Sequence, residues 1–196
     1  MEEKELWFIQ GLGNNFTKKE KIKLIVWRLV DFFLFKPSLV VFSRWRIFLL
    51  RLFGARIGHS CFISPKATIF VPWKVQIGNC SSLDDYVICS RSIGKIIIGD
   101  YVSISAGVHL VPGGHDIRSR GFENNATFLK IEDGVFLGAD SFVGRGVTIG
   151  KFSVLGSRAA AYKDIPENSV AVGMPAKVIR ERIPYEEFVK YRYSED

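Results

Sequence analysis

The sequence of 196 residues predicts an all-β fold, a parallel β-helix that follows a helical arm. Two observations carry this prediction. A six-residue repeat runs through most of the chain after residue 56, and a basic, apolar segment without that repeat precedes it. Proteins built from short repeats stack each unit on its neighbours. We therefore expect an arm at 1–56, a β-helix at 57–175, and a C-terminal tail with a short helix at 176–196.

The arm carries the excess positive charge of the chain. The whole chain has 27 basic and 20 acidic side chains, a net charge of +7. Residues 18–56 hold ten Lys and Arg against two acidic residues (+8), whereas residues 1–17 carry −2 and residues 57–196 carry +1. Charge gathered in one segment indicates a localised partner. It argues against nucleic acid, whose binding surfaces spread basic residues over a whole face.

Two helices are expected in the arm. The first covers 18–36 and ends at Pro37, and the second begins at Ser38 and ends at Gly54. A bilayer span needs about 20 apolar residues with few charges. The best apolar run, 24–35, has twelve residues and includes two charged ones, so we reject a span.

Two uses of the arm stay open, and they are compatible. The helices can cover an open end of the β-helix or a subunit interface. Alternatively, residues 18–53 can make a peripheral contact with an anionic membrane surface, because aromatic side chains stand among Lys and Arg. The aromatic residues considered for this contact are Trp27, Phe32, Phe33, Trp45 and Phe48.

The cysteines and the first residues indicate a cytoplasmic protein, in which a membrane contact would place the chain at the inner face. Cys61, Cys80 and Cys89 are odd in number and lack a paired spacing. The chain opens Met-Glu-Glu-Lys-Glu, acidic where a secretory signal would be basic. We therefore expect buried free thiols in a reducing compartment.

The repeat is clearest from residue 131, where five units follow one another without a slip. Every sixth residue is aliphatic, and the next residue is Gly in four of the five units. The aliphatic positions are Ile131, Leu137, Val143, Ile149 and Leu155. Each unit should form one strand and one corner, so that about 18 residues close a coil and the aliphatic side chains stack inside it at about 4.8 Å. We expect the glycine to relax the backbone near the corner.

Residues 57–110 show the same repeat in other phases, and the phase slips between the runs. From Leu110 to Ile131 the spacing is 21 residues, which is not a multiple of six. Stacking holds the residues that are in phase, so a slip must leave the wall of the β-helix. We expect an extruded loop at about 112–130, with His115 at its root.

These features together resemble the hexapeptide-repeat acyltransferases over residues 57–182. The resemblance rests on the [Leu/Ile/Val]-Gly-x4 repeat, on Gly-His-Asp at 114–116 before the loop, and on the closing KDIPENSVAVGMPAKVIRER at 163–182. Within the family the β-helix is similar to galactoside and maltose O-acetyltransferases. SRWRIFLLRLFGARIG at 43–58 is similar to the arm of colanic-acid-type polysaccharide acetyltransferases. The resemblance implies a left-handed β-helix and a homotrimer with three sites between neighbouring subunits.

The resemblance also implies the chemistry. Acetyl-CoA is the acyl donor, and a saccharide, free or lipid-linked, is the acceptor. His115 would act as general base on the acceptor hydroxyl, which attacks the thioester directly. Asp116 would orient the loop or the imidazole, or serve only as a turn former. Asp85, with Asp84 beside it, would contact the acceptor sugar, or be a coil-corner carboxylate that faces water. Both alternatives stay open.

The resemblance also implies which residues contact the acyl donor, acetyl-CoA. The matching positions are Phe136, Ala139, Ser157, Lys163, Lys177 and Arg180. Lys177 and Arg180 would face the adenosine phosphates, where cations are needed. The chain departs from the family pattern at Phe136, where Trp is usual, at Arg145, where Pro is usual, and at Tyr162, where Thr is usual. These departures affect the shape expected for the groove between neighbouring β-helices that holds acetyl-CoA in this family.

Three other functional classes compete with this interpretation. A zinc carbonic anhydrase of this fold needs three imidazoles on one metal. The chain has His59, His109 and His115 but lacks the His-x4-His pair, so no metal is expected. Transfer to the amine of a nucleotide sugar or to a xenobiotic would use the same histidine, and a non-catalytic scaffold would not need the intact motifs. The sequence thus predicts an acetyl-CoA-dependent O-acetyltransferase of a saccharide in cell-surface polysaccharide biosynthesis.

Overall fold

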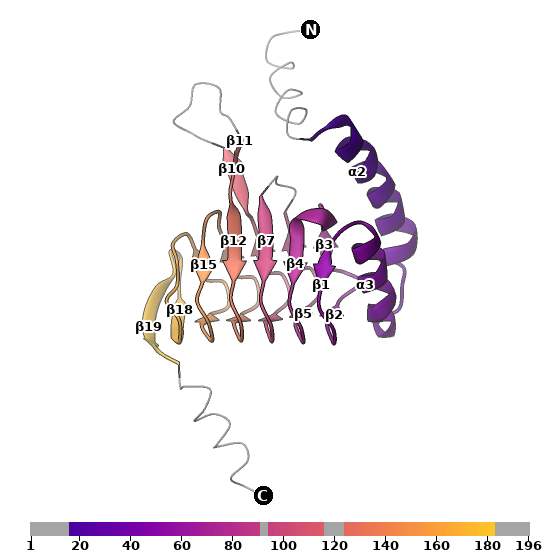
Figure 1. Cartoon of the computed structure of the whole chain (residues 1–196). Helices are drawn as coiled ribbons and strands as arrows, with labels where there is room; N and C mark the ends of the chain where they lie inside the picture. Colours follow the sequence, from indigo (N-terminus) through magenta and orange to yellow (C-terminus); the bar gives the residue numbers. More distant parts are fainter. Residues whose placement is uncertain (1–15, 91–93, 116–123, 183–196) are drawn as a thin grey trace, which may run out of the picture.

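From Arg56 onward, strands of two to five residues alternate with tight corners, so that successive strands belong to three different sheets. The structure is a computed structural model that describes residues 16–90, 94–115 and 124–182. The sheets form the walls of a stack of coils, with two helices at one end and strand β19 at the other (Figure 1).

The three walls are named here sheets A, B and C. Sheet A contains β1 (Arg56–Ile57), β4 (Val75–Ile77), β7 (Lys95–Ile98), β12 (Phe128–Ile131) and β15 (Thr148–Ile149). Sheet B contains β2 (Phe62–Ile63), β5 (Ser82–Leu83), β8 (Ser103–Ile104), β13 (Phe136–Leu137), β16 (Val154–Leu155), β18 (Ser169–Val172) and β19 (Lys177–Glu181). Sheet C contains β3 (Thr68–Ile69), β6 (Ile88–Cys89), β9 (His109–Leu110), β14 (Phe142–Val143) and β17 (Ala160–Ala161). Apart from β18–β19, the described pairs within these sheets are parallel, which confirms the predicted β-helix.

The aliphatic positions of the repeat form the core. The five predicted between 131 and 155 are all 0% exposed. They stack in register from coil to coil, as Ile98, Ile131 and Ile149 do in sheet A. Because the interior is closed by these columns, the chemistry of the protein has to lie on its outer walls and corners.

The repeat glycines have a different role from the one the sequence suggested. Gly78 does not adopt a positive φ; the left-handed corner positions are instead occupied by residues such as Tyr101 and Phe152, with φ of 56°. A Cβ on Gly78 would lie 2.5 Å from the Gly99 carbonyl carbon and would also meet the Asp100 carboxylate. The expectation of a relaxed backbone is therefore wrong here. The glycine is needed because the next coil leaves no room for a side chain.

This packing predicts a stability effect at Gly78. The Gly78→Ala substitution should lower the free energy of unfolding by about 1–3 kcal/mol, because the backbone of the next coil must shift. Urea denaturation followed by circular dichroism would measure it. At Gly114, where the nearest atoms to an added Cβ are 3.8 Å away, the same substitution is the control. Equal stability of Gly78→Ala and the parent chain would contradict the steric argument.

The arm contains two helices, but the second begins at Ser43 and not at the predicted Ser38. Helix α2 (Lys18–Val30) starts with a capping box between Thr17 and Glu20, and it continues into a π-helical turn at Asp31–Phe35. A 3-10 turn at Val40–Phe42 leads into helix α3 (Ser43–Leu52), which ends at Gly54 with φ +94°. A further 3-10 turn, Pro72–Lys74, lies between β3 and β4. Among the residues described, no helix is long and apolar enough to cross a membrane.

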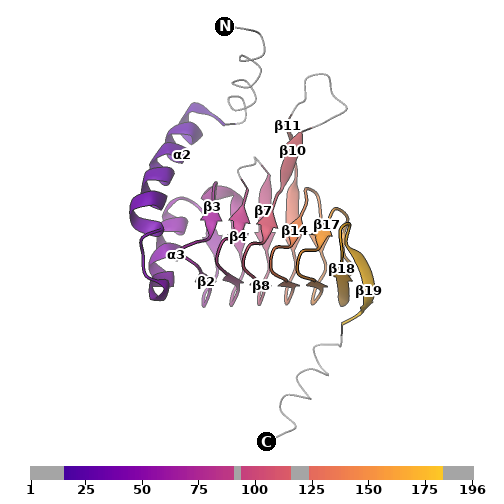
Figure 2. The same cartoon turned by 180° about the vertical axis from the view of Figure 1, so that it is seen from behind.

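The arm covers the first coil of the β-helix (Figures 1 and 2). Trp27 is fully buried, packs on Phe35 and Phe53, and donates a hydrogen bond from Nε1 to the Ile69 carbonyl at 2.8 Å. The interpretation of the arm as an end cap is confirmed. Trp27 belongs to this cap, so its inclusion among the membrane-contacting aromatic residues is wrong.

Two segments differ from the sequence prediction. The phase slip after Leu110 holds a hairpin of β10 (Gly113–His115) and β11 (Asn124–Ala126), which projects from the stack in Figure 1. The chain is back in sheet A by Phe128, so the expected loop ends earlier than residue 130. Residues 177–181, expected in a tail or helix, form β19 antiparallel to β18. Asp116 and residues 183–196 lie outside the described residues.

Candidate functional site

His115 ends strand β10, at the root of the hairpin that leaves the corner between sheets C and A. It pairs with Asn124 across the hairpin and is half-buried. Arg145, from the same corner of the next coil, donates a hydrogen bond from Nη1 to the His115 carbonyl at 3.3 Å. The hairpin root is therefore attached both to its own second strand and to the wall. In the sequence, Arg145 stands out only as a departure from the family pattern, and this contact was not predicted.

Aromatic side chains lie on the wall next to this corner. Phe142 in β14 and Tyr162, at the corner one coil further on, have ring centroids 5.5 Å apart, and Tyr162 is exposed. Lys163 follows Tyr162 at the corner and is also exposed. The corner between sheets C and A thus presents an imidazole, two cations and aromatic faces from three successive coils.

Asp85 lies at a different corner, the one between sheets B and C. One carboxylate oxygen accepts a hydrogen bond from the Ser64 hydroxyl, and the other pairs with Lys66 Nζ at 2.7 Å. The Lys66 ammonium also lies 5.3 Å from the centre of the Tyr86 ring. The hydrogen bonds from Lys66 and Ser64 hold the pKa of Asp85 below its usual value, so this carboxylate is ionised at neutral pH.

These contacts bear on the two alternatives for Asp85. Both of its oxygens are engaged by donors of the coil below, so an acceptor hydroxyl would have to share them. Asp84 beside it is exposed and accepts a hydrogen bond from the Asp85 backbone N–H at 2.8 Å. Ser64 and Lys66 were not predicted. Aligning the first coil with the second in the sequence would have placed Ser64 and Lys66 next to Asp85.

Three of the predicted donor positions gather at the corner that holds Asp85. Ala139 and Ser157 occupy it in successive coils, and Lys177 begins β19 opposite Val172, where β18 reaches the same corner. The other positions are spread more widely. Phe136 is exposed on sheet B, Arg180 lies opposite Val170 further along β19, and Lys163 is at the His115 corner.

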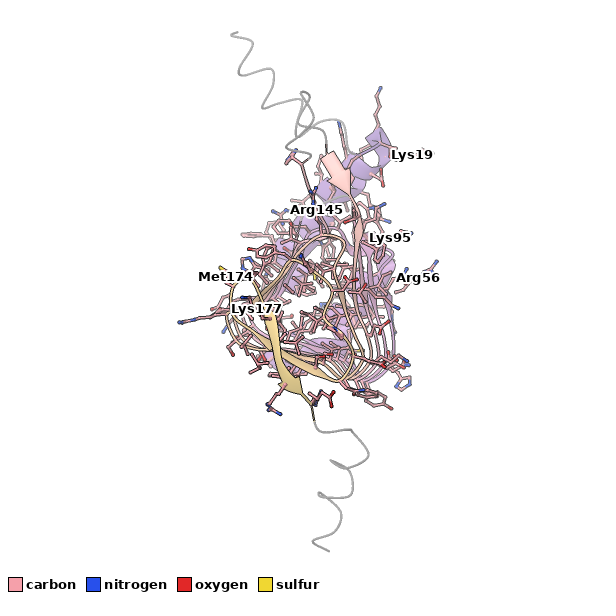
Figure 3. The ribbon with its side chains drawn as sticks, turned by 90° about the vertical axis from the view of Figure 1, so that its left-hand side faces the viewer. Lys19, Arg56, Lys95, Arg145, Met174 and Lys177 are labelled. Atoms are coloured by element: carbon pink, nitrogen blue, oxygen red, sulfur yellow. The ribbon has the colours of Figure 1, made fainter. Side chains whose placement is uncertain are left out.

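Within one chain the two corners are separate. The strands of sheet C lie between them, since Asp85 precedes β6 and His115 follows β9. Seen along the stack, Arg145 lies beneath the hairpin, while Met174 and Lys177 lie at another corner (Figure 3). A single chain therefore does not bring His115 and the Asp85 corner together. A second chain that faced its Asp85 corner toward the hairpin would do so.

The histidines do not form a metal site in the part of the chain that is described. His59 lies in the first coil, whereas His109 and His115 lie two coils further on. Among the described residues, no group of three or more His, Cys, Asp or Glu side chains is placed to hold a metal ion.

Comparison with known proteins identifies close relatives among acetyltransferases. No family model matches the chain. The chain is 42% identical over 176 residues, 90% of its length, to WcaF of Escherichia coli (strain K12), an acetyltransferase assigned to colanic acid biosynthesis, and covers 96% of that protein. It is 31% identical over 143 residues, 68% of its length, to the galactoside O-acetyltransferase of the same organism, and covers 66% of that enzyme.

Solved structures share the fold. A hexapeptide-repeat acetyltransferase of Vibrio cholerae superposes with a TM-score of 0.78 at 22% identity, covering 86% of this chain and 95% of that one. A galactoside acetyltransferase in complex with coenzyme A superposes with a TM-score of 0.70 at 24% identity, covering 87% of this chain and 86% of that one. The left-handed β-helix that the resemblance implied is thereby confirmed.

Proposed function

The chain belongs to the hexapeptide-repeat acetyltransferases, and on that premise we propose that it acetylates a saccharide hydroxyl in the biosynthesis of a cell-surface polysaccharide. Acetyl-CoA is the acyl donor of this enzyme. The observation that carries the proposal is the 42% identity to a colanic acid acetyltransferase over nearly the full length of both chains. The three described cysteines are free thiols, which supports a cytoplasmic reaction at the site of acetyl-CoA supply. Only Cys89 is buried, so the prediction of burial is wrong for Cys61 and Cys80, which lie partly exposed.

In the proposed reaction His115 is the general base. Its imidazole takes the proton of the acceptor hydroxyl while that oxygen forms a bond to the thioester carbonyl carbon. The C–S bond then breaks, and the imidazolium returns the proton to the sulfur of coenzyme A. A main-chain N–H stabilises the oxyanion formed in between. The hydrogen bond from Arg145 to the His115 carbonyl supports this role because it fixes the base relative to the wall.

The remaining residues are proposed to position the two substrates. Asp85, with Asp84, would accept hydrogen bonds from the acceptor, whose saccharide is free or lipid-linked. The donor would lie along the corner that contains Ala139 and Ser157. Around it, Phe136 would pack on the pantetheine arm, and Lys163, Lys177 and Arg180 would pair with phosphates. Asp116 would orient the imidazole or its loop.

The separation of the two corners supports a site shared between subunits, and the family resemblance makes the proposed assembly a homotrimer. If His115 comes from one subunit and the Asp85 corner from its neighbour, each interface of a closed three-fold assembly contains one complete site. The outer wall of sheet C, with the partly buried Phe142 and the exposed Tyr162, would then face the neighbouring subunit, which explains why the Tyr162 ring remains exposed in a single chain.

Release of the coenzyme A thiol from acetyl-CoA tests the proposed function. The full chain would be assayed with neutral sugars, oligosaccharides, a polyprenyl-linked saccharide and an amino-sugar nucleotide. We expect release that depends on a saccharide hydroxyl, with an acetyl ester in the product. Release only with the amino-sugar nucleotide would replace the proposal with amide formation. No release with any acceptor, together with no binding of acetyl-CoA, would leave the non-catalytic scaffold.

A further inference from the structure

The outer side of the arm exposes an apolar surface that the β-helix does not cover. Fourteen of the twenty-three exposed large hydrophobic side chains among the described residues lie between residues 22 and 52. They are Ile22, Ile25, Val26, Leu29, Phe32, Phe33, Leu34, Leu39, Val40, Val41, Phe42, Trp45, Phe48 and Leu52, and we call them the outer face of the arm. A large contiguous apolar surface of this kind marks an interaction site.

The outer face is continuous across the helices. Trp45 in α3 donates a hydrogen bond from Nε1 to the Leu34 carbonyl at 3.3 Å, which joins α3 to the π-helical turn. The Trp45 and Phe48 rings stack at 5.7 Å, and the Phe32 and Phe33 rings meet edge to face at 4.9 Å. The aromatic residues of the turn and of α3 therefore share one surface.

Helix α2 presents one set of its apolar residues outward. Ile22, Ile25 and Leu29 follow helical spacing on the exposed side, whereas Trp27 alone is fully buried on the inner side. A surface helix of a soluble protein directs its apolar stripe to the core and its charges to water. Here the apolar stripe on the outside is not covered by any other part of the chain that the structure describes.

The charges around the outer face have one sign. Exposed basic residues of the arm and first strand include Lys18, Lys19, Lys21, Arg44 and Arg56, whereas Arg28 packs over the Phe70 ring and Arg51 donates to the Ile57 and Gly58 carbonyls. In residues 16–56 the acidic residues are Glu20, which is partly buried in the capping box, and Asp31, which is buried. In this part of the chain no acidic side chain is fully exposed.

From this pattern we propose that the outer face docks on the surface of a bilayer that contains anionic lipids. Apolar and aromatic side chains enter the boundary between headgroups and acyl chains, and the surrounding Lys and Arg pair with lipid phosphates. A second copy of the chain is the less suitable occupant, because face-to-face packing would bring two positively charged rims together. Helices α2 and α3 have 13 and 10 residues, whereas a bilayer span needs about 20, so the proposed contact is with the bilayer surface.

The position of the arm sets how the protein would stand on the membrane. Both helices lie at the end of the stack opposite β19, so this end would face the lipid and the coils would extend away from it (Figures 1 and 2). The surface contact involves neither His115 nor the Asp85 corner. Vesicle binding can therefore be tested separately from acetyl transfer, and failure of one would not imply failure of the other.

Vesicle binding by the full chain tests the proposal. We expect co-sedimentation with vesicles of equal parts phosphatidylglycerol and phosphatidylcholine at low salt, weaker binding as salt is raised, and little binding to phosphatidylcholine alone. The double variant Phe32→Ser/Phe33→Ser should bind the anionic vesicles about tenfold or more weakly, since two large apolar side chains no longer enter the lipid. Tyr101→Ser is the matched control, because Tyr101 is 69% exposed and Phe32 is 68% exposed.

The charges are tested separately. Replacing Lys18, Lys19 and Lys21 with Gln should weaken binding by about fivefold per lysine at low salt. Replacing Lys95, Lys130 and Lys151 with Gln changes the net charge equally but away from the arm, and should have little effect. Absence of binding to anionic vesicles at low salt would overturn the proposal. A second result would also overturn it. If the chain did not bind vesicles but formed an oligomer that the Phe32→Ser/Phe33→Ser variant dissociates, a second copy of the chain would be the occupant of the outer face.

Discussion

Replacing His115 with alanine is expected to lower the rate of acetyl transfer by about 10²–10⁴-fold, the range for loss of a general base. A neutral hydroxyl is a poor nucleophile at pH 7, so losing the group that removes its proton should act on kcat. The backbone of the hairpin root is held by pairing with Asn124 and by Arg145, so the fold should persist. Initial rates of thiol release at saturating acetyl-CoA would measure the effect.

The control for this prediction is His59→Ala, which removes an exposed imidazole from the first coil. Its rate should stay within about twofold of the parent chain, as expected for a surface substitution away from the site. Binding of acetyl-CoA by His115→Ala should also be retained. An unchanged rate in His115→Ala would remove this residue from the proposed mechanism.

Trimers assembled from two different variants test whether the two corners of one site come from different subunits. His115→Ala and Asp85→Asn should each be weakly active alone. If each site takes His115 from one subunit and Asp85 from its neighbour, trimers assembled from both variants contain some sites with both native residues. Mixing the subunits through co-expression should therefore restore part of the activity. No recovery in assemblies shown to contain both variants would contradict a site shared between subunits.

The sequence was sufficient for features that depend on neighbours in the chain. The column of aliphatic residues, the stop of the first helix at Pro37 and the departure of the chain near His115 all follow from local spacing. Contacts between coils were harder to predict from the sequence. The crowding at Gly78 comes from Gly99 and Asp100, and the partners of Asp85 lie one coil below, so both needed the register of stacking.

Two features were not predicted from the sequence: which side of helix α2 is buried, and the strand formed by residues 177–181. Helix α2 has apolar residues on two sides, and spacing alone does not say that Trp27 is the one turned inward. In the tail, Val178 and Ile179 are β-branched residues that favour a strand wherever an edge is free. The last described parallel strand, β18, offers such an edge, and β19 pairs with it. Tertiary context thus decided both outcomes.

Arg46 is the residue whose structural importance the charge count concealed. It is fully buried, although the sequence placed it among the basic residues of a surface arm. Its guanidinium donates to the Ile63 carbonyl at 2.7 Å, to the Leu39 and Val40 carbonyls at 2.7 Å each, and to the Ser38 hydroxyl at 2.9 Å. Burial lowers the pKa of Arg46, but these four acceptors compensate for the water that the charge has lost. Arg46 therefore fastens the segment between the two helices onto strand β2.

We expect Arg46→Met to lower the free energy of unfolding by about 3–5 kcal/mol, because it leaves the buried Ile63 carbonyl and the partly buried Leu39 and Val40 carbonyls without this donor. Arg46→Lys should recover only part of this loss, since one ammonium group cannot reproduce the planar fork of donors. Urea denaturation at a single protein concentration would measure both, because the stability of an oligomer depends on concentration. Arg44→Met, two residues away and exposed, should change the stability by no more than about 0.5 kcal/mol. If Arg46→Met and Arg44→Met unfolded at the same urea concentration, the guanidinium would contribute nothing beyond its apolar stem, and the attachment of the arm would have to rest on Trp27 and its neighbours.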